Sequence, residues 1–216
     1  MASDVDGSEE YPVSEALRLV DGETIYRTDE WWKAFVSYQY EDSPDGDSVD
    51  RAVYLWHNDD GEWKRKQKYL VRSRDTWITD REYIEEFLSA DSGDPANYDF
   101  DESSLPVSDY LTVGDAATVF KTEDWWKAVV RIDGKGDWTT REVVVYVWQE
   151  NEGEWRRRQK YAIKSQSDWE EEVEIISKCL SDGSTSKEPE STFDPDEVKE
   201  DIQKKMRRKH LGERFE

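Results

Sequence analysis

Apolar and polar residues alternate along two long stretches of the chain, the pattern of half-buried β-strands. The runs are short and rich in β-branched and aromatic residues, which favours strands over helices. In the first stretch they lie around Ile25 and at 31–38, 51–56 and 63–71. In the second stretch they lie around Val119 and at 125–132, 141–148 and 155–163. Each stretch therefore predicts four strands.

Each set of strands is followed by a segment with a helical period. Ser167 and Glu170 form a possible capping box before the second such segment, and Asp75 precedes the first. The apolar positions that recur at helical spacing are Trp77, Ile84, Phe87 and Leu88, then Trp169, Val173, Ile176 and Leu180. We therefore expect two ββββα units, whose helices either cover a sheet face or meet each other.

The two stretches are copies of one module. YPVSEAL is echoed by LPVSDYL, IYRTDEWWKAFV by VFKTEDWWKAVV, and AVYLWHNDDGEWKRKQKYLVRS by VVYVWQENEGEWRRRQKYAIKS. The duplication places one ββββα unit at 11–88 and the other at 105–180. An acidic linker at 89–104 joins them, and a second linker at 181–193 leads to a predicted basic C-terminal helix at 194–212.

The net charge of the chain and its distribution bear on which partners the chain can bind. Asp and Glu number 52 against 30 Lys and Arg, a net charge of −22, which argues against a polyanionic partner. Between Lys121 and Lys164, however, ten basic residues outnumber eight acidic ones. An acidic surface suits concentrated salt, so we expect a halophilic source, such as a halophilic archaeon. Disorder is the alternative, and 11 Trp, 11 Tyr and six Phe argue against it for the whole chain.

The remaining composition restricts location and chemistry. Cys179 is the single cysteine, so no intramolecular disulfide can form, and we expect it to be packed and inert. Apolar runs do not reach the roughly 18 residues of a membrane span, and the first residues lack a signal-peptide pattern. We expect a cytoplasmic protein without a membrane partner. His57 and His210 are the only histidines, and no glycine-rich phosphate loop occurs. We therefore expect no enzyme activity, cofactor or metal.

A candidate binding surface follows from strand alternation, which places basic rows beside aromatic rows. Cations for phosphates beside rings for bases are the composition of a surface that binds single strands. The predicted site residues of the first unit are Trp31, Lys33, Tyr54, Trp56, Lys64, Lys66, Lys68 and Arg72. Those of the second unit are Trp125, Lys127, Arg131, Tyr146, Trp148, Arg156, Arg158, Lys160 and Lys164. The alternative is that the rings pack under the helices or between the units, and that the cations guard a solvated sheet edge.

Each unit resembles the single-strand DNA-binding domain of the positive cofactor four transcriptional coactivators, through VFKTEDWWKAVVRI, VVVYVWQENEGEW, RRRQK and SQSDWEEEVEII. The resemblance implies an α+β fold of antiparallel sheets, with the two copies paired through their helices as an intrachain pseudo-dimer. It also implies that Trp56 and Trp148 end the third strands, with Lys68 and Lys160 in the basic fourth strands. The chain departs from the family at Val145, where the family has a basic residue.

The sequence thus predicts a single-stranded DNA-binding protein that serves as a transcription coactivator or regulator. RNA remains an alternative ligand, because no residue pattern reports a contact to a 2′-hydroxyl. A protein-interaction module in transcription or replication is a further alternative, because aromatic and Arg-rich surfaces also anchor protein partners. The expected assembly is a monomeric pseudo-dimer or a higher oligomer.

Overall fold

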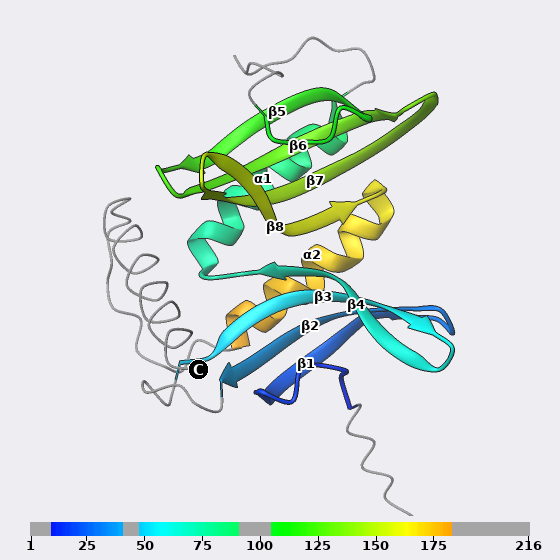
Figure 1. Ribbon diagram of the computed structural model, residues 1–216. Coiled ribbons are helices and arrows are strands. Elements are labelled where there is room, and N and C mark those ends of the chain that lie inside the picture. Colours follow the sequence, from blue (N-terminus) through cyan, green and yellow to red (C-terminus); the bar gives the residue numbers. More distant parts are fainter. Residues whose placement is uncertain (1–9, 41–47, 91–104, 183–216) are drawn as a thin grey trace, which may run out of the picture. The chain divides into compact units, whose positions relative to one another are not determined.

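The computed structural model describes residues 10–40, 48–90 and 105–182 (Figure 1). The predicted C-terminal helix at 194–212 lies outside the described residues, as do most residues of the two predicted linkers. The first half contains β1 (Leu17–Arg27), β2 (Trp31–Tyr40), β3 (Asp50–Asp59), β4 (Glu62–Leu70) and α1 (Arg74–Ser89). The second half contains β5 (Leu111–Lys121), β6 (Trp125–Lys135), β7 (Trp138–Asn151), β8 (Glu154–Ile163) and α2 (Gln166–Asp182). The prediction of two tandem ββββα units is confirmed.

Each half forms one antiparallel sheet with its strands in sequence order, β1-β2-β3-β4 and β5-β6-β7-β8. The last hairpin of each sheet turns through two residues with positive φ, Asp60 and Gly61 in the first half and Glu152 and Gly153 in the second. Turns with two left-handed residues match the right-handed twist of the strands they join. The pairs Asp-Gly and Glu-Gly therefore fix tight hairpins at equivalent places.

A serine residue immediately precedes each helix and caps its first turn. The Ser73 hydroxyl accepts a hydrogen bond from the Thr76 backbone N–H at 3.2 Å, and the Thr76 hydroxyl accepts one from the Ser73 N–H at 3.2 Å, which closes a capping box. In α2 the Ser165 hydroxyl accepts from the Asp168 N–H at 3.1 Å. The prediction of a cap at Ser167 is therefore wrong by two residues, because Ser165 satisfies the free N–H groups of the first turn.

The helices are exchanged between the halves. Helix α1 packs on the second sheet, where the Arg141 side chain donates a hydrogen bond to the Phe87 carbonyl at 3.3 Å. Helix α2 reaches the first sheet, where Lys178 forms an ion pair with Glu23 at 3.0 Å. Figure 1 shows both helices in the layer between the two sheets. One apolar core thus contains residues of both halves, among them Phe35, Val53, Trp77, Ile84, Phe87, Val129, Val145, Trp169 and Ile176.

Strands β4 and β8 lie side by side where the halves meet. Two glutamine side chains cross this seam in matching ways. The Gln159 Oε1 accepts a hydrogen bond from the Leu70 N–H at 3.0 Å, and the Gln67 Oε1 accepts one from the Ala162 N–H at 3.2 Å. One backbone N–H in the edge strand of each sheet is therefore satisfied by a side chain of the other sheet.

A second apolar cluster lies on the outer face of each sheet, the face directed away from the helices. In the first half it contains Trp32 and Trp56, and the ring of Tyr11 packs against Trp32 with centroids 5.1 Å apart. Gly22 permits this contact, because a Cβ at that position would lie 2.5 Å from the Tyr11 ring. In the second half Leu105 takes the corresponding place. The repeated YPVSEAL and LPVSDYL segments thus supply residues that pack on the outer faces.

Helix length and hydropathy also bear on membrane insertion. Within the described ranges, neither α1 nor α2 combines the length and the apolar composition that crossing a bilayer requires.

Candidate nucleic-acid interface

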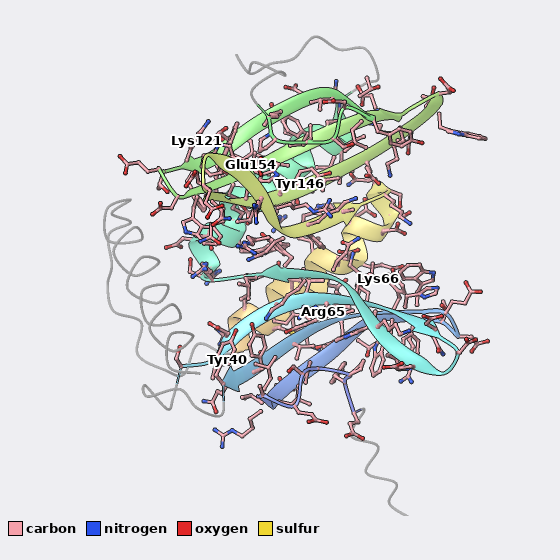
Figure 2. The ribbon with its side chains drawn as sticks, in the orientation of Figure 1. Tyr40, Arg65, Lys66, Lys121, Tyr146 and Glu154 are labelled. Carbon is pink, nitrogen blue, oxygen red and sulfur yellow. The ribbon has the colours of Figure 1, made fainter. Side chains whose placement is uncertain are left out.

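The candidate site lies on the outer face of each sheet, where a β-bulge changes which cations stand beside the rings. In the first half Tyr54 pairs with Lys68, as strict alternation predicts, but Trp56 pairs with Arg65. Lys66 is the extra residue that the bulge inserts into β4. Arg65 and Lys68 therefore share a face with Tyr54 and Trp56, and Figure 2 marks Arg65 and Lys66 on this strand.

The second half repeats the bulge at the equivalent place. Tyr146 pairs with Lys160, and Trp148 pairs with Arg157, which leaves Arg158 as the inserted residue. The Arg158 guanidinium instead donates a hydrogen bond to the Gln149 side chain at 2.9 Å. We call these two equivalent sets the outer aromatic–basic faces: Tyr54, Trp56, Arg65 and Lys68 in the first half, and Tyr146, Trp148, Arg157 and Lys160 in the second.

The single basic row predicted for each fourth strand is therefore wrong. Lys64 pairs with His57 and Arg156 pairs with Gln149, so both lie on the opposite face from Lys68 and Lys160. The physical reason is that one inserted residue reverses the side-chain alternation beyond it. The exposed cations among the predicted site residues are Lys64, Lys66, Arg72, Arg156, Arg158 and Lys164.

Aromatic rings form a ladder across the first outer face. Tyr54 and Trp56 stack with their centroids 5.1 Å apart and their planes 3° from parallel. Tyr38 continues the ladder beside Tyr54 at 6.2 Å, and Tyr40 follows beside Tyr38 at 5.7 Å. The Lys68 ammonium lies 4.6 Å from the centroid of Tyr38 and 5.3 Å from that of Tyr54. Such cation–π contacts place the cation over the ring faces.

The ring–cation arrangement differs in the second half. Tyr146 and Trp148 also stack at 5.1 Å, with 23° between their planes. Ile132 lies on the β6 position that Tyr38 occupies in β2, and Gly134 lies on the position of Tyr40. The ladder of four rings is therefore shortened to two in this half.

The expected exposure of the predicted rings is contradicted by their burial. The exposed fractions are 1% for Tyr54, 0% for Trp56, 2% for Tyr146 and 1% for Trp148. Their faces belong to the outer apolar clusters, so a base cannot stack on them in this conformation. Burial raises the pKa of Tyr54 and of Tyr146 to about 12, because it disfavours the phenolate. The ring at the open end of the ladder is Tyr40, which is 50% exposed.

Three predicted cations lie inside the molecule instead of on a binding surface. Lys33 forms a buried ion pair with Glu172 of α2, and Lys127 forms one with Asp80 of α1. Arg131 is also buried, with its guanidinium 3.2 Å from Asp133. Burial lowers the pKa of Lys33, and Glu172 opposes that shift. Strand alternation does not reveal the two lysine pairs, because each carboxylate comes from the helix of the other half.

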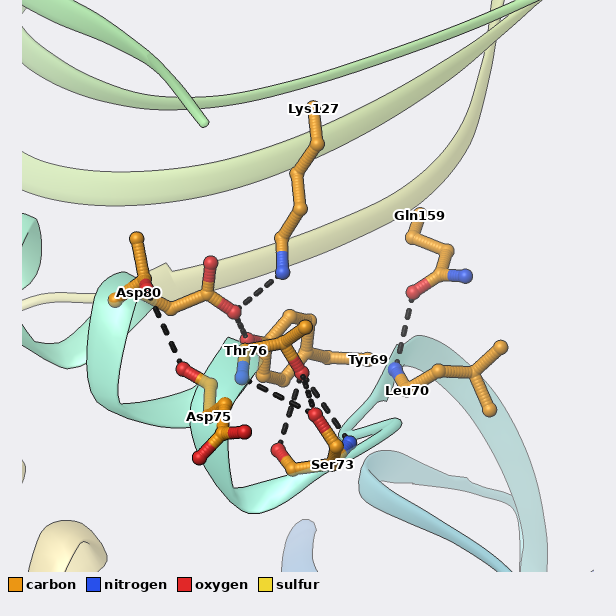
Figure 3. A network of polar contacts seen from close by, with 9 residues as sticks. Tyr69, Leu70, Ser73, Asp75, Thr76, Asp80, Lys127 and Gln159 are labelled. Atoms are coloured by element: carbon orange, nitrogen blue, oxygen red, sulfur yellow. Dashed lines mark hydrogen bonds and ion pairs between the residues drawn. The ribbon is translucent and has the colours of Figure 1, made fainter. Parts of the chain in front are cut away.

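Figure 3 shows the network around one of these pairs. The Lys127 ammonium and the Tyr69 hydroxyl both donate to the same carboxylate oxygen of Asp80. The equivalent Glu172 accepts from Lys33 on one oxygen and from the Tyr161 hydroxyl on the other. Each network joins a strand of one half to a helix and a strand of the other, so these residues hold the halves together.

The remaining predicted rings are the first residues of the central strands β2 and β6. Trp31 and Trp125 are half-buried, and Trp31 contacts His57 edge to face with centroids 4.5 Å apart. Since strand neighbours point to opposite faces, neither ring joins the outer aromatic–basic face that Trp32 or Trp126 borders. Trp31 and Trp125 are therefore separate from the Tyr and Trp pairs with which the sequence grouped them.

Sequence reasoning missed Arg65, Arg157 and Tyr40. The signal for the two arginines is the unbroken basic run in KRKQK and RRRQK, since three consecutive cations place basic residues on both faces of the strand and show no alternation of basic and other residues. A run of this kind fits a bulged strand end, where alternation is interrupted. Tyr40 could have been identified from the alternation of Tyr38 and Tyr40 along β2.

Other reactive groups do not form a site in the described part of the chain. No group of three or more His, Cys, Asp or Glu side chains there is arranged to hold a metal ion. Burial raises the pKa of the Cys179 thiol to about 11, and the nearby Glu23 carboxylate acts in the same direction. A thiol with this pKa is a poor nucleophile at neutral pH.

Comparisons with known proteins do not identify a family for this chain, so the proposed function rests on its own residues. No protein-family model, no curated protein and no solved structure matches this chain at a significant level.

Proposed function

We propose that the chain binds single-stranded nucleic acid, with DNA as the first candidate, along its two outer aromatic–basic faces. The observation that carries this proposal is the repeated β-bulge. In both halves it brings an arginine to the face that already holds a lysine and a stacked Tyr–Trp pair. Cations beside rings are the combination that takes backbone phosphates and bases together. A role as a transcription coactivator or regulator belongs to the same proposal and rests on the family resemblance.

Local charge supports a polyanionic ligand despite the acidic chain. The segment 50–72, with the last hairpin of the first sheet, has six basic and four acidic residues. The segment 138–164 of the second sheet has the same numbers. Exposed arginines such as Arg65 and Arg157 offer several donors in a planar fork, which suits phosphate oxygens. Each hairpin is therefore a local positive region on a negative molecule.

Ring burial changes the order of contacts. Phosphates are expected to meet the cations first, because Arg65 and Arg157 are exposed whereas the Tyr–Trp pairs are not. In the first half stacking then begins on Tyr40, half of whose surface is open and whose ring continues the ladder toward Tyr54. At roughly 1 M salt the screening length is about 3 Å, so direct contacts of this kind must supply the affinity.

The test is fluorescence anisotropy of labelled oligothymidylate over a series of KCl concentrations. The double substitution Arg65→Ala with Lys68→Ala is expected to weaken binding by about a hundredfold at low salt, because it removes two charge-assisted hydrogen bonds that each contribute at least about 1.5 kcal/mol. The slope of log affinity against log salt should fall by about 0.7 for each phosphate that is no longer neutralised. Arg157→Ala with Lys160→Ala tests the second half in the same way.

A matched control removes two cations elsewhere. Arg81→Ala with Lys178→Ala changes the net charge equally, but both side chains lie on helices and pair with Glu85 and Glu23. This variant should bind like the wild type. An equal decrease in affinity in the control and the hairpin variants would mean that only net charge matters. No binding of single strands at low salt would overturn the proposal, and tighter binding of oligouridylate would make RNA the ligand.

One observation favours a protein partner as the second candidate function. Trp138 is 77% exposed and Tyr110 is 59% exposed, both in the second half. Exposed Trp and Tyr side chains are frequent anchors of protein interfaces. Trp138→Ala with Tyr110→Ala should leave oligonucleotide affinity unchanged if these rings serve a protein, and should lower it if they stack on bases.

A further inference from the structure

A buried carboxylate lies between two lysines on the outer face of the second sheet. Glu142 of β7 is 4% exposed. Its Oε2 lies 2.9 Å from the Lys135 ammonium of β6, and its Oε1 lies 3.8 Å from the Lys160 ammonium of β8. Three adjacent strands thus contribute one cation, one carboxylate and one cation.

The Glu142 carboxylate forms a hydrogen-bonded ion pair with only one of the two lysines. A separation of 3.8 Å is too long for a hydrogen bond, and Glu142 Oε1 has no hydrogen-bond partner in the described part of the chain. A buried acceptor without a donor is unfavourable. A nucleic-acid phosphodiester has two charged oxygens, as a carboxylate has, but it is not tethered to β7 and is therefore free to lie within hydrogen-bond distance of both ammonium groups. Lys135 and Lys160 remain partly exposed, with side chains 35% and 29% open.

The surrounding charges also favour an anion. Burial lowers the pKa of Lys160, and Lys135 and Arg157 add to this effect by repulsion, whereas Glu142 opposes it. Two ammonium groups therefore lie at the Glu142 carboxylate, and Arg157 adds a third positive charge that acts on Lys160. An ammonium group in this position gains from any added negative charge.

The first half is built differently at the equivalent place. Asp50 occupies the position of Glu142 and is one methylene shorter. It pairs across the sheet with Tyr38, whereas Glu142 pairs with Ile132. The Lys68 ammonium contacts the rings of Tyr38 and Tyr54. The arrangement of Lys135, Glu142 and Lys160 is thus particular to the second half.

We infer that Lys135 and Lys160 form a phosphate site of the second half, and that the Glu142 carboxylate occupies this site until a nucleic-acid phosphate displaces it. Glu142 then acts as an internal competitor that weakens binding by the second half. This inference rests on the proposed function and adds which groups hold the phosphate and what opposes it there.

The decisive experiment is Glu142→Gln in the full chain, with anisotropy of labelled oligothymidylate measured over a KCl series. The amide keeps the shape of the side chain and removes the charge. We expect binding about tenfold tighter at low salt, the effect of one added charge-assisted hydrogen bond. The salt slope should steepen by about 0.7, as for one more phosphate neutralised on a single strand. Lys135→Ala with Lys160→Ala should abolish the increase in affinity.

Glu152→Gln is the matched control, since it removes one carboxylate from the exposed turn of the same sheet. A similar increase in affinity in this control would reduce the effect to net charge and overturn the inference. If Glu142→Gln fails to fold, Glu142→Asp withdraws the carboxylate by one methylene and should also tighten binding. If the wild type binds but a folded Glu142 variant binds no tighter, the role of Glu142 as a competitor is refuted and the proposed function is not. Absence of binding in the wild type and all variants refutes the proposed function as well.

Discussion

The rings of Tyr69 and Tyr161 stack where β4 meets β8, with their centroids 4.6 Å apart and their planes 5° from parallel. Each hydroxyl donates to the buried acid of its own half, Asp80 or Glu172, and each acid also accepts from a lysine of the opposite half. Burial raises the pKa of both tyrosines well above the usual value. Two polar networks thus meet back to back at the centre of the molecule.

Lys33→Met tests how much one of these networks contributes to stability. The substitution leaves Glu172 as an unpaired buried charge, so the free energy of unfolding should fall by about 3–5 kcal/mol. Adding Glu172→Gln should recover most of that stability, because a neutral amide still accepts a hydrogen bond from Tyr161. Urea denaturation in high KCl measures both effects. Lys178→Met, which removes an exposed ion pair, should lower the free energy of unfolding by no more than about 1 kcal/mol. If Lys33→Met lowers it by no more than Lys178→Met does, the buried ion pair of Lys33 does not contribute as proposed.

Trp56→Ala should act mainly on stability. The ring is fully buried, so its removal leaves a cavity in the outer cluster and should lower the free energy of unfolding by about 3–5 kcal/mol. Trp148→Ala should behave alike, because its ring is buried to the same degree. Thermal unfolding, followed by circular dichroism, is the measurement. A variant of unchanged stability that no longer binds oligonucleotide would instead identify the ring as an accessible contact.

Alkaline pH should destabilise the fold through the buried tyrosines. The pKa of Tyr54 and Tyr146 rises from 10.0 to about 12 in the folded chain, which means that folding favours the neutral phenol. The stability that they contribute is fully present below pH 10 and decreases as the pH rises toward 12. Urea midpoints across this range, read with tyrosinate absorbance, test the effect. Tyr54→Phe with Tyr146→Phe should flatten the decline, and phenols that ionise near pH 10 in folded protein would refute it.

The first half alone, residues 10–90, should not be a folded monomer. Trp77, Ile84 and Phe87 of α1 are buried in the core shared with the second sheet, and they would be exposed without it. We expect two copies to exchange helices, with Lys33 of one facing Asp80 of the other. Sedimentation velocity distinguishes the outcomes. A folded monomer would show that α1 can return to its own sheet.

The strands, the helices and the duplication could be predicted from the sequence, because alternation and helical period are local properties of the chain. Helix exchange could not be predicted in this way. A helix with one apolar stripe buries that stripe equally well on either sheet, so the pattern of Trp77, Ile84 and Phe87 does not choose between them. The burial of Lys33 and Lys127 escapes prediction for the same reason, since their partners belong to the opposite half.

The candidate site was predicted in part. The association of Tyr54 and Trp56 with Lys68 follows from strand alternation, and the register agrees. Alternation fails beyond the bulge at Lys66, where Arg65 replaces Lys64 on the outer face. Ring burial was also missed, because a strand with apolar residues on both faces does not reveal which face remains open. The apolar cluster on the outer face buries these rings, and only the three-dimensional structure shows this.

Fusion of the two modules has a consequence for how they can change. In a symmetric dimer of identical chains every substitution occurs twice, so both binding surfaces alter together. Here Tyr38 corresponds to Ile132 and Asp50 to Glu142 at matching places, while the Tyr–Trp pair is present in both halves. A single chain can therefore assign different tasks to its two surfaces without giving up the shared interior that holds them together.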